Sequence, residues 1–385
     1  MSRRTRGFST RAIHGLADAA RGAGPVATVL DPSTTWRWSD VDAGPAMGAE
    51  VGPPEFYRRY GSPNAAALES RLAELEGAER ALAVGSGMVA NTAALMAVLP
   101  AGGHLVCGRT VYGEVANFLG GLAPRLGITT SWAAGWSVDD FEASLRPETR
   151  AIFVETPANP TLDVVDLAAL GAMAERRGVA VVCDATLATP YNVQPLRHGC
   201  ALVTHSATKY LGGHSDAMGG VVAGSAELVT RAWQFVRVTG GVIAPFDAWL
   251  IERGLRTLAL RMDRIDANAR AVVEHLRAHP AVARVWYPRS EGAIAEQYRG
   301  FGGVLSVALH GGVPAARRFV GRLRLFSLAT SLGGVESLVQ FPASMARIPP
   351  SERARLGVPE DMIRLAVGCE DAVDLCDDLD AALAD

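Results

Sequence analysis

The stretch VAVVCDAT, residues 179–186, decides the fold, because a run of small and β-branched apolar residues ends there in an aspartate, Asp184. A strand that is apolar along its whole length is buried on both faces, which is typical of a mostly parallel sheet covered by helices. Similar runs, separated by helical stretches, occur on either side: RALAVG (80–85), HLVCG (104–108), ITTSW (128–132), AIFVE (151–155), ALVTHS (201–206) and GGVVAG (219–224). The sequence therefore predicts a large α/β domain with helices on both faces of its sheet.

The composition along the chain suggests three parts. Residues 1–60 carry Gly and Pro at short intervals and show little periodicity, which indicates an extended arm. Residues 61–244 are expected to form the large α/β domain. Residues 245–385 open with a long helical stretch, predicted to reach about His279, and continue with strand pairs beside helices. This last part is expected to form a smaller α+β domain.

Bulk properties exclude several classes of protein. The 385-residue chain has a formal net charge of -3 with acidic and basic residues interspersed, so no basic surface for nucleic acid or for a membrane is expected. No apolar run approaches the length of a membrane span, and the five cysteines match neither a zinc site nor a disulfide framework. We therefore expect a cytoplasmic protein that acts on a small molecule and binds no metal.

The stretch THSATKY, residues 204–210, contains the only lysine of the chain, although Lys and Arg together number 37. A guanidinium stays protonated in proteins, whereas an amine can lose its proton and act as a nucleophile or a base. Lys209 is therefore a candidate for imine chemistry or for general-base catalysis. The alternative is an ordinary surface residue in an arginine-rich protein, and the neighbouring motifs decide between the two.

The stretch GSGMVANTAAL, residues 85–95, predicts a helix that starts near Gly87 and is capped by Ser86. The amides of Gly87 and Met88 then lie at the positive end of that helix, which suits a phosphate group. The same letters fit the pattern G-x-G-x-x-A, so a dinucleotide-binding site and a purely structural turn are alternatives. A dinucleotide site calls for an acidic residue at the end of the next strand, where Cys107 stands instead.

Two further strand ends supply matching groups. Asp184 suits the protonated nitrogen of a heteroaromatic ring, because a facing negative charge stabilises a cation; alone, it could equally be an N-cap or part of a surface ion pair. Ser206 and Thr208 lie on one side of an extended segment and offer hydroxyls to a phosphate, while Lys209 points the other way. An amine, a carboxylate for a ring nitrogen and phosphate donors together indicate pyridoxal 5'-phosphate (PLP).

Five stretches carry a resemblance to a known family: ETPANPTLDVVDL (155–167), DATLATPYNVQPL (184–196), HSATKYLGGHSDAMGG (205–220), PFDAWLIERGLRTLALRM (245–262) and SLGGVESL (331–338). From about Thr10 to Leu383 the chain resembles the PLP enzymes of Cys/Met metabolism, which include cystathionine γ-synthase, cystathionine γ-lyase and methionine γ-lyase. The resemblance implies fold type I of the PLP-dependent transferases, which is aspartate-aminotransferase-like, and PLP as the cofactor.

The resemblance also implies roles for individual residues. Lys209 would bind PLP covalently, Asp184 would hold the pyridine nitrogen, and Tyr112 in TVYGE would stack on the ring and assist proton transfer. The remaining cofactor contacts would come from backbone amides and hydroxyls near the strand ends: Gly87, Met88, Thr186, Ser206 and Thr208. The substrate carboxylate would be bound by a separate group: Arg364 in MIRLAVG, Asn159 in PANP, and Ser331.

The stretch EFYRRYGSPN, residues 55–64, resembles the segment that joins neighbouring subunits in this family. Tyr57 and Arg59 match a Tyr-x-Arg pair that reaches the phosphate of the neighbouring subunit. The resemblance therefore implies a homodimer at least, and related enzymes are usually homotetramers built from two such dimers. In such an oligomer, the N-terminal arm would pack against the surface of the neighbouring subunit.

The implied activity is that of a carbon-sulfur lyase or a γ-replacement enzyme acting on a cystathionine-, methionine- or activated-homoserine-like amino acid, as in transsulfuration. The alternatives are a β-eliminating cystathionine or cysteine-conjugate lyase, a γ-replacement enzyme of specialised metabolism, and a catalytically idle PLP-binding regulator. The presence of both Lys209 and Tyr112 argues against an idle protein.

Two departures from the family pattern leave the substrate open. Glu114 stands two residues after Tyr112, where γ-eliminating relatives commonly have a small residue or a cysteine, and it is expected to line the substrate pocket. Thr330 replaces the glutamate of many cystathionine-cleaving relatives and the apolar residue of methionine-cleaving ones.

Overall fold

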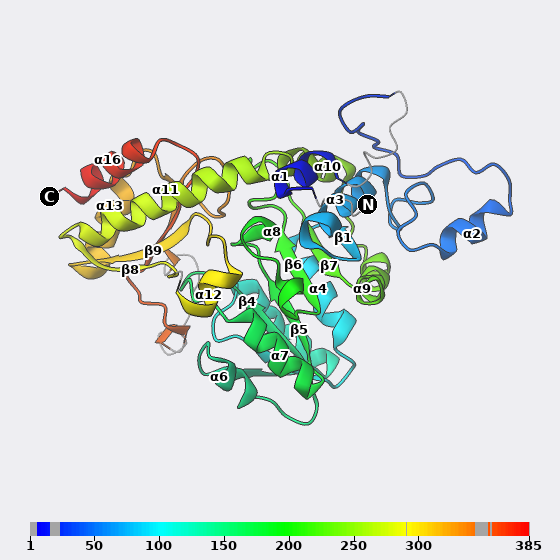
Figure 1. Ribbon diagram of the computed structural model, residues 1–385, viewed down its shortest axis with the longest axis horizontal. Helices are drawn as coiled ribbons and strands as arrows, with labels where there is room; N and C mark the ends of the chain where they lie inside the picture. The colour runs from blue at the N-terminus through cyan, green and yellow to red at the C-terminus, as the bar shows by residue number, and fades with distance from the viewer. Residues whose placement is uncertain (1–5, 16–23, 290, 343–352, 355, 385) are drawn as a thin grey trace.

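The computed structural model (Figure 1) describes residues 6–15, 24–289, 291–342, 353–354 and 356–384. Its larger sheet has seven strands in the order β1-β7-β6-β5-β4-β2-β3, and neighbouring strands are parallel except where β7 meets β1 and β6. The strands coincide with the seven predicted runs: β1 (Arg80–Val84), β2 (His104–Cys107), β3 (Thr129–Trp132), β4 (Thr149–Glu155), β5 (Ala180–Asp184), β6 (Leu202–Ser206) and β7 (Gly220–Gly224). The predicted α/β class is confirmed.

Alternate residues of the strands enter two different hydrophobic cores, one on each face of the sheet. In β5, Val182 packs in one core, whereas its neighbours Val181 and Cys183 pack in the other. Helices α4 and α9 contribute to the first core, and α3 and α7 to the second. These helices have the following bounds: α3 (Pro63–Glu76), α4 (Gly87–Val98), α7 (Leu167–Arg177) and α9 (Ala226–Thr239). The sheet is therefore covered on both faces, which its apolar runs require.

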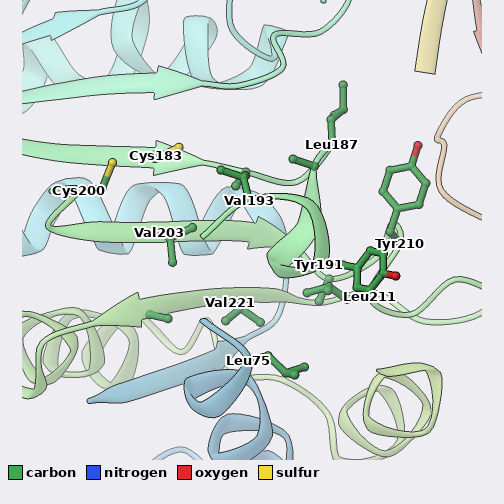
Figure 2. Close-up of a cluster of buried hydrophobic side chains, with 14 of the residues drawn as sticks. Leu75, Cys183, Leu187, Tyr191, Val193, Cys200, Val203, Tyr210, Leu211 and Val221 are labelled. Atoms are coloured by element: carbon green, nitrogen blue, oxygen red, sulfur yellow. The ribbon is translucent and has the colours of Figure 1, made fainter. Parts of the chain in front are cut away.

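The segment after β6 is anchored by the residues that follow Lys209. Tyr210 and Leu211 are each 1% exposed and belong to the core with Cys183, as Figure 2 shows. The Tyr210 hydroxyl accepts a hydrogen bond from the Gly303 amide at 2.9 Å, and its carbonyl accepts one from Arg261 Nη1 at 2.6 Å. The backbone that carries Lys209 is therefore fixed by packing and by hydrogen bonds.

A second, five-stranded sheet follows along the chain in the order β10-β11-β12-β9-β8, antiparallel except between β10 and β11. It packs with three helices around its own core, one of which is α11 (Leu258–Ala278). The elements are β8 (Val282–Trp286), β9 (Val304–Leu309), α13 (Gly312–Arg322), β10 (Ser327–Leu328), β11 (Leu338–Gln340), β12 (Ile363–Ala366) and α16 (Ala372–Leu383). The strands of the two sheets do not interleave along the sequence. The division of the chain after residues 60 and 244 stays a prediction.

The long helical stretch predicted from Pro245 is divided into two helices, α10 (Pro245–Leu255) and α11 (Leu258–Ala278). At the break, the Thr257 hydroxyl donates to the Gly254 carbonyl at 3.1 Å, and such a local bond competes with continuation of a helix. α11 runs from one core to the other: Met262 packs with the larger sheet and Leu276 with the smaller (Figure 1). This helix therefore ties the two sheets together.

Part of the N-terminal segment differs from the expected extended arm. It contains two helices of seven residues each, α1 (Phe8–His14) and α2 (Ala43–Ala49). Ala12 of α1 is fully buried, and its carbonyl accepts a hydrogen bond from Arg71 Nη1 at 2.7 Å. Helices this short span too few turns to show periodicity, so the sequence did not reveal them.

The remaining elements are short: α5 (Gly113–Asn117), a π-helix (Phe118–Leu122), 3₁₀-helices (Ala123–Leu126 and Pro195–His198), α6 (Val138–Glu142), α8 (Thr189–Asn192) and α12 (Gly292–Gln297). Within the described ranges, no helix combines the length and apolar character needed to cross a bilayer. All five cysteines lie in the described part of the chain, and none of them forms a disulfide there.

Replacement of Gly254 by alanine is expected to destabilise the protein by about 1–3 kcal/mol. A Cβ at Gly254 would meet the carbonyl oxygens of Leu211 (2.7 Å) and Gly212, so α10 would be pushed away from the segment that follows Lys209. Urea denaturation measures the loss. The matched control is Gly321→Ala in α13, where a Cβ meets nothing within 4 Å and alanine should be neutral or slightly stabilising. Equal effects of the two substitutions would contradict this packing.

Candidate active site

Lys209 lies just beyond the carboxyl end of β6, where its ammonium group is removed from most of the solvent. Its Nζ donates a hydrogen bond to Ser331 Oγ at 2.7 Å. Burial, and then the positive charge of Arg364, lower the pKa of Lys209 to about 8. A substantial fraction of this amine is therefore neutral near physiological pH, which a nucleophile or a base requires.

Arg364, in β12, forms the other side of the same site. It is 6% exposed; Nη2 donates to the Ser331 carbonyl at 2.6 Å, and Nη1 donates to Asn159 Oδ1 at 3.2 Å. Its Nε finds no hydrogen-bond partner among the described residues. Because buried polar groups are nearly always paired, this N–H indicates an acceptor that binds there, and a carboxylate matches the guanidinium geometry.

Ser331 is the residue that brings these two cations together. Its backbone adopts φ 85°, a left-handed conformation that a residue with a side chain rarely takes. In this conformation the hydroxyl binds the Lys209 amine and the carbonyl binds the Arg364 guanidinium. Backbone strain of this kind is typical of functional sites, where the surrounding structure enforces it.

Asp184, at the end of β5, is a buried carboxylate with a fixed orientation. Its Oδ1 accepts from the Thr186 amide at 3.0 Å and from the Thr186 hydroxyl at 2.6 Å, and its Oδ2 accepts from Asn91 Nδ2 at 2.9 Å. Asn91 in turn accepts from the Thr204 hydroxyl at 2.5 Å. A carboxylate held in this way can face and stabilise a cationic ring nitrogen. Asn91 was not predicted from the sequence, although an amide within a mostly apolar helix is a visible signal.

The start of α4 meets the end of β6 at close range. The Ser86 hydroxyl accepts from the Val89 amide at 3.2 Å, so the predicted helix cap is confirmed. A Cβ at Gly87 would lie 2.7 Å from Ser206 Cβ, so only glycine fits there. Met88 follows in the first turn and packs partly against the α4 and α9 core. A helix N-terminus beside a serine hydroxyl has the donors that a phosphate needs.

The other two predicted cofactor contacts, Thr186 and Thr208, also lie at this edge of the sheet. The Thr186 hydroxyl accepts from the Ser206 amide at 2.7 Å, which links Asp184 to the end of β6. The Thr208 hydroxyl is engaged with the backbone of Gly219, donating to its carbonyl at 3.2 Å and accepting from its amide at 3.1 Å. An amine, a held carboxylate and a phosphate cradle thus converge, and this donor set fits PLP. The individual cofactor contacts stay predictions.

Tyr112 and Asn159 are joined by Glu155, the last residue of β4. Glu155 Oε2 accepts from the Tyr112 amide at 2.6 Å, and Oε1 accepts from the Asn159 amide at 2.9 Å. Burial and the adjacent Asp184 charge raise the pKa of Glu155 to about 8. Glu155 was not predicted as a site residue, although it ends the run AIFVE in the same way that Asp184 ends its own strand.

The Tyr112 side chain is half-exposed, at 47%. Partial burial, and then the negative charges of Glu114 and Glu155, raise the pKa of its hydroxyl. Glu114 is exposed in the first turn of α5. Thr330 is also exposed and directly precedes Ser331.

Two predicted cofactor ligands lie apart from this group within one chain. Arg59 Nη1 donates to the Arg237 carbonyl at 3.0 Å, and its guanidinium lies over the rings of Tyr57 and Tyr60. Tyr57 is 38% exposed and forms a β-bridge with Thr35. These contacts tie the pair to α9 and to the N-terminal segment, and none of them involves Lys209.

Comparison with known proteins shows matches along nearly the whole chain. The family model described as "Cys/Met metabolism PLP-dependent enzyme" matches residues 9–384. A cystathionine gamma-lyase of Bacillus subtilis is 40% identical, with 97% of this chain and 98% of the relative covered. An L-methionine gamma-lyase of Pseudomonas putida is 41% identical, with 98% and 97% covered. The crystal structure of metB from Corynebacterium glutamicum superposes with a TM-score of 0.91 at 36% identity, covering 98% of both chains.

Amine labelling of the cofactor-free protein should report the pKa of Lys209 directly, because the α-amino group is the only other amine. Trinitrobenzenesulfonate labelling, with peptide mass mapping to separate the two sites, is expected to give a midpoint of about 8 for Lys209. Arg364→Gln should raise this midpoint, because it removes a repelling positive charge.

The control for this labelling is Arg231→Gln, which removes an arginine from the exposed side of α9 and should leave the midpoint unchanged. A Lys209 midpoint near 10, as in an exposed lysine, would contradict the described environment. An unchanged midpoint in Arg364→Gln would contradict the role of that charge.

Proposed function

The chain belongs to the family of Cys/Met metabolism PLP-dependent enzymes, and we propose that it eliminates or replaces a group at the γ-carbon of a cystathionine-, methionine- or activated-homoserine-like amino acid. It is a PLP-dependent enzyme of sulfur amino acid metabolism. The observation that carries the proposal is the convergence of an amine and a guanidinium on Ser331. The two groups match the reacting centre and the carboxylate of an α-amino acid.

The guanidinium of Arg364 would orient the substrate. Its unpartnered Nε and adjacent Nη atoms suit the α-carboxylate, and Asn159 Oδ1 fixes the guanidinium from one side. With the carboxylate held there, the α-carbon lies toward Lys209. Such positioning converts an encounter in solution into a fixed arrangement of reacting atoms, which is a large part of catalysis.

Lys209 would carry protons between carbon atoms of the substrate. When bound, PLP supplies an electrophilic carbonyl group and a ring that accepts electrons. Loss of a γ-substituent also requires that protons leave the α- and β-carbons, and a nearby base must take them. An amine with a pKa of about 8 can both accept and return a proton near neutral pH.

The Tyr112 hydroxyl would serve the departing group. Because its pKa is raised, this hydroxyl keeps its proton at neutral pH and can act as an acid toward a leaving sulfur or oxygen. Glu114 adds a negative charge on the same side. We therefore place Glu114 beside the γ-substituent, where a carboxylate favours leaving groups that carry a positive charge or hydrogen-bond donors.

A second copy of the chain would complete the site. Tyr57 and Arg59 are exposed in one chain, and the family resemblance assigns this pair to the phosphate of the neighbouring subunit. We therefore propose a homodimer as the smallest active unit, with a tetramer of two such dimers as the expected assembly. The cytoplasmic location expected from the sequence also stays a prediction.

The purified enzyme, offered L-cystathionine, L-methionine and an O-activated homoserine with and without a thiol, is expected to act at the γ-carbon. Mass spectrometry of the products should find 2-oxobutanoate for elimination or a new thioether for replacement. Pyruvate as the main product would show instead that the enzyme acts at the β-carbon. A protein that converts none of these compounds, and whose Lys209→Ala variant keeps its cellular role, would be a regulator.

Mixing of two inactive variants tests whether subunits share the site. Each site would take Lys209 from one chain and Arg59 from the other. In a mixed dimer of Lys209→Ala and Arg59→Ala, one site therefore has both residues intact and the other site lacks both. Random mixing should therefore restore about a quarter of the wild-type activity. The matched control pairs Lys209→Ala with Tyr112→Phe, which damage the same chain's half of the site and should restore none. If mass spectrometry detects mixed dimers but the mixture of Lys209→Ala and Arg59→Ala stays inactive, the prediction of a shared site is wrong.

A further inference from the structure

Glu155 makes two contacts that join separate parts of the site. One oxygen of its carboxylate accepts the Tyr112 amide at 2.6 Å, and the other accepts the Asn159 amide at 2.9 Å. Tyr112 stands at the start of α5, and Asn159 lies in the loop after β4. The two segments are 47 residues apart in sequence, and each carries a side chain of the proposed reaction.

The placement of Glu155 in a buried sheet makes its carboxylate a fixed reference point. It is 3% exposed and stands opposite Asp184 in the pairing of β4 with β5. Arg364 is near enough for its positive charge to act on this carboxyl group, and the Asp184 charge opposes it. Burial of a carboxyl beside another carboxylate is unfavourable, so the two amide hydrogen bonds must offset part of that cost. A residue that served packing alone would not need a carboxyl group.

We propose that Glu155 is a positioning residue that holds Tyr112 and Asn159 in one frame, so that the proton donor and the substrate-carboxylate site keep a fixed separation. The roles given to Tyr112 and Asn159 rest on the proposed function, whereas the two hydrogen bonds of Glu155 do not. Each carboxyl oxygen accepts a hydrogen bond from one of the two amides, and these two hydrogen bonds favour the ionised form. A glutamine would turn one of them into an N–H donor that faces an amide donor, so one contact is lost.

Hydrogen exchange of the purified holoenzyme, followed by mass spectrometry, tests the contacts without any turnover. In Glu155→Gln, amide exchange is expected to be about tenfold faster in at least one of the two peptides that contain Tyr112 and Asn159. In Glu155→Asp, exchange should be faster in both peptides, because the shorter side chain reaches neither amide well. The matched control is Glu252→Gln, another buried glutamate that binds Arg71 at 2.7 Å. It should leave both segments unchanged.

Steady-state kinetics then test whether the contacts position the reacting groups. Glu155→Gln is expected to lower kcat and raise KM together, whereas Tyr112→Phe mainly lowers kcat and Asn159→Ala mainly raises KM. The double variant Glu155→Gln/Tyr112→Phe should lose less activity than the product of the single losses, because both act through one group. Glu252→Gln should change neither constant.

Two results would overturn the proposal. Unchanged exchange around both Tyr112 and Asn159 in Glu155→Gln and Glu155→Asp would show that the contacts do not hold these segments. Faster exchange with unchanged kcat and KM would show that Glu155 has only a structural role. The same conclusion would follow if the activity loss of Glu155→Gln/Tyr112→Phe equalled the product of the two single losses. If no substrate is turned over at all, the proposed function fails, while the exchange result still decides whether Glu155 ties the two segments together.

Discussion

A buried guanidinium and a half-buried amine meet at one residue, and the rest of the site depends on that constraint. Ser331 binds the Lys209 amine through its hydroxyl and the Arg364 guanidinium through its carbonyl. Neither cation can leave this arrangement without losing a hydrogen bond in a poorly solvated place. The guanidinium keeps its charge, so the amine is the group that gives up its proton. The fold thereby places an amine with a lowered pKa, which gives up its proton more readily, next to a permanent cation, and the two groups suit the two ends of an α-amino acid.

The scaffold makes this meeting possible because it joins two sheets. Lys209 and Asp184 come from strand ends of the larger sheet, whereas Arg364 comes from a strand of the smaller one. Helix α11 contributes to both hydrophobic cores and so fixes the distance between the sheets. Tyr210, directly after Lys209, is locked by a hydrogen bond from the amide of Gly303, which directly precedes β9 of the smaller sheet. Substrate-binding and cofactor-binding groups therefore share one rigid frame.

The sequence predicted best what depends on burial. All seven strands of the larger sheet were predicted, because strands buried on both faces leave continuous apolar runs such as VAVVC. The break at Thr257 was not predicted, since it depends on a side-chain hydrogen bond to Gly254 that leaves no mark on periodicity. Glu155 and Asn91 stand at visible positions, a strand end and a mostly apolar helix, but their roles depend on partners that only the folded chain brings close. Lys209 and Asp184, in contrast, could be predicted from the chemistry of their residue types.

The central claim is that the single lysine of this chain carries the cofactor covalently, and borohydride reduction tests it most directly. The freshly isolated enzyme, produced with ample vitamin B6, would be reduced, digested and analysed by peptide mass mapping. The account predicts one pyridoxyl label, on the peptide that contains Lys209, and none in Lys209→Arg. A wild-type protein that carries no label at Lys209 after reduction would contradict the account, together with the mechanism built on it.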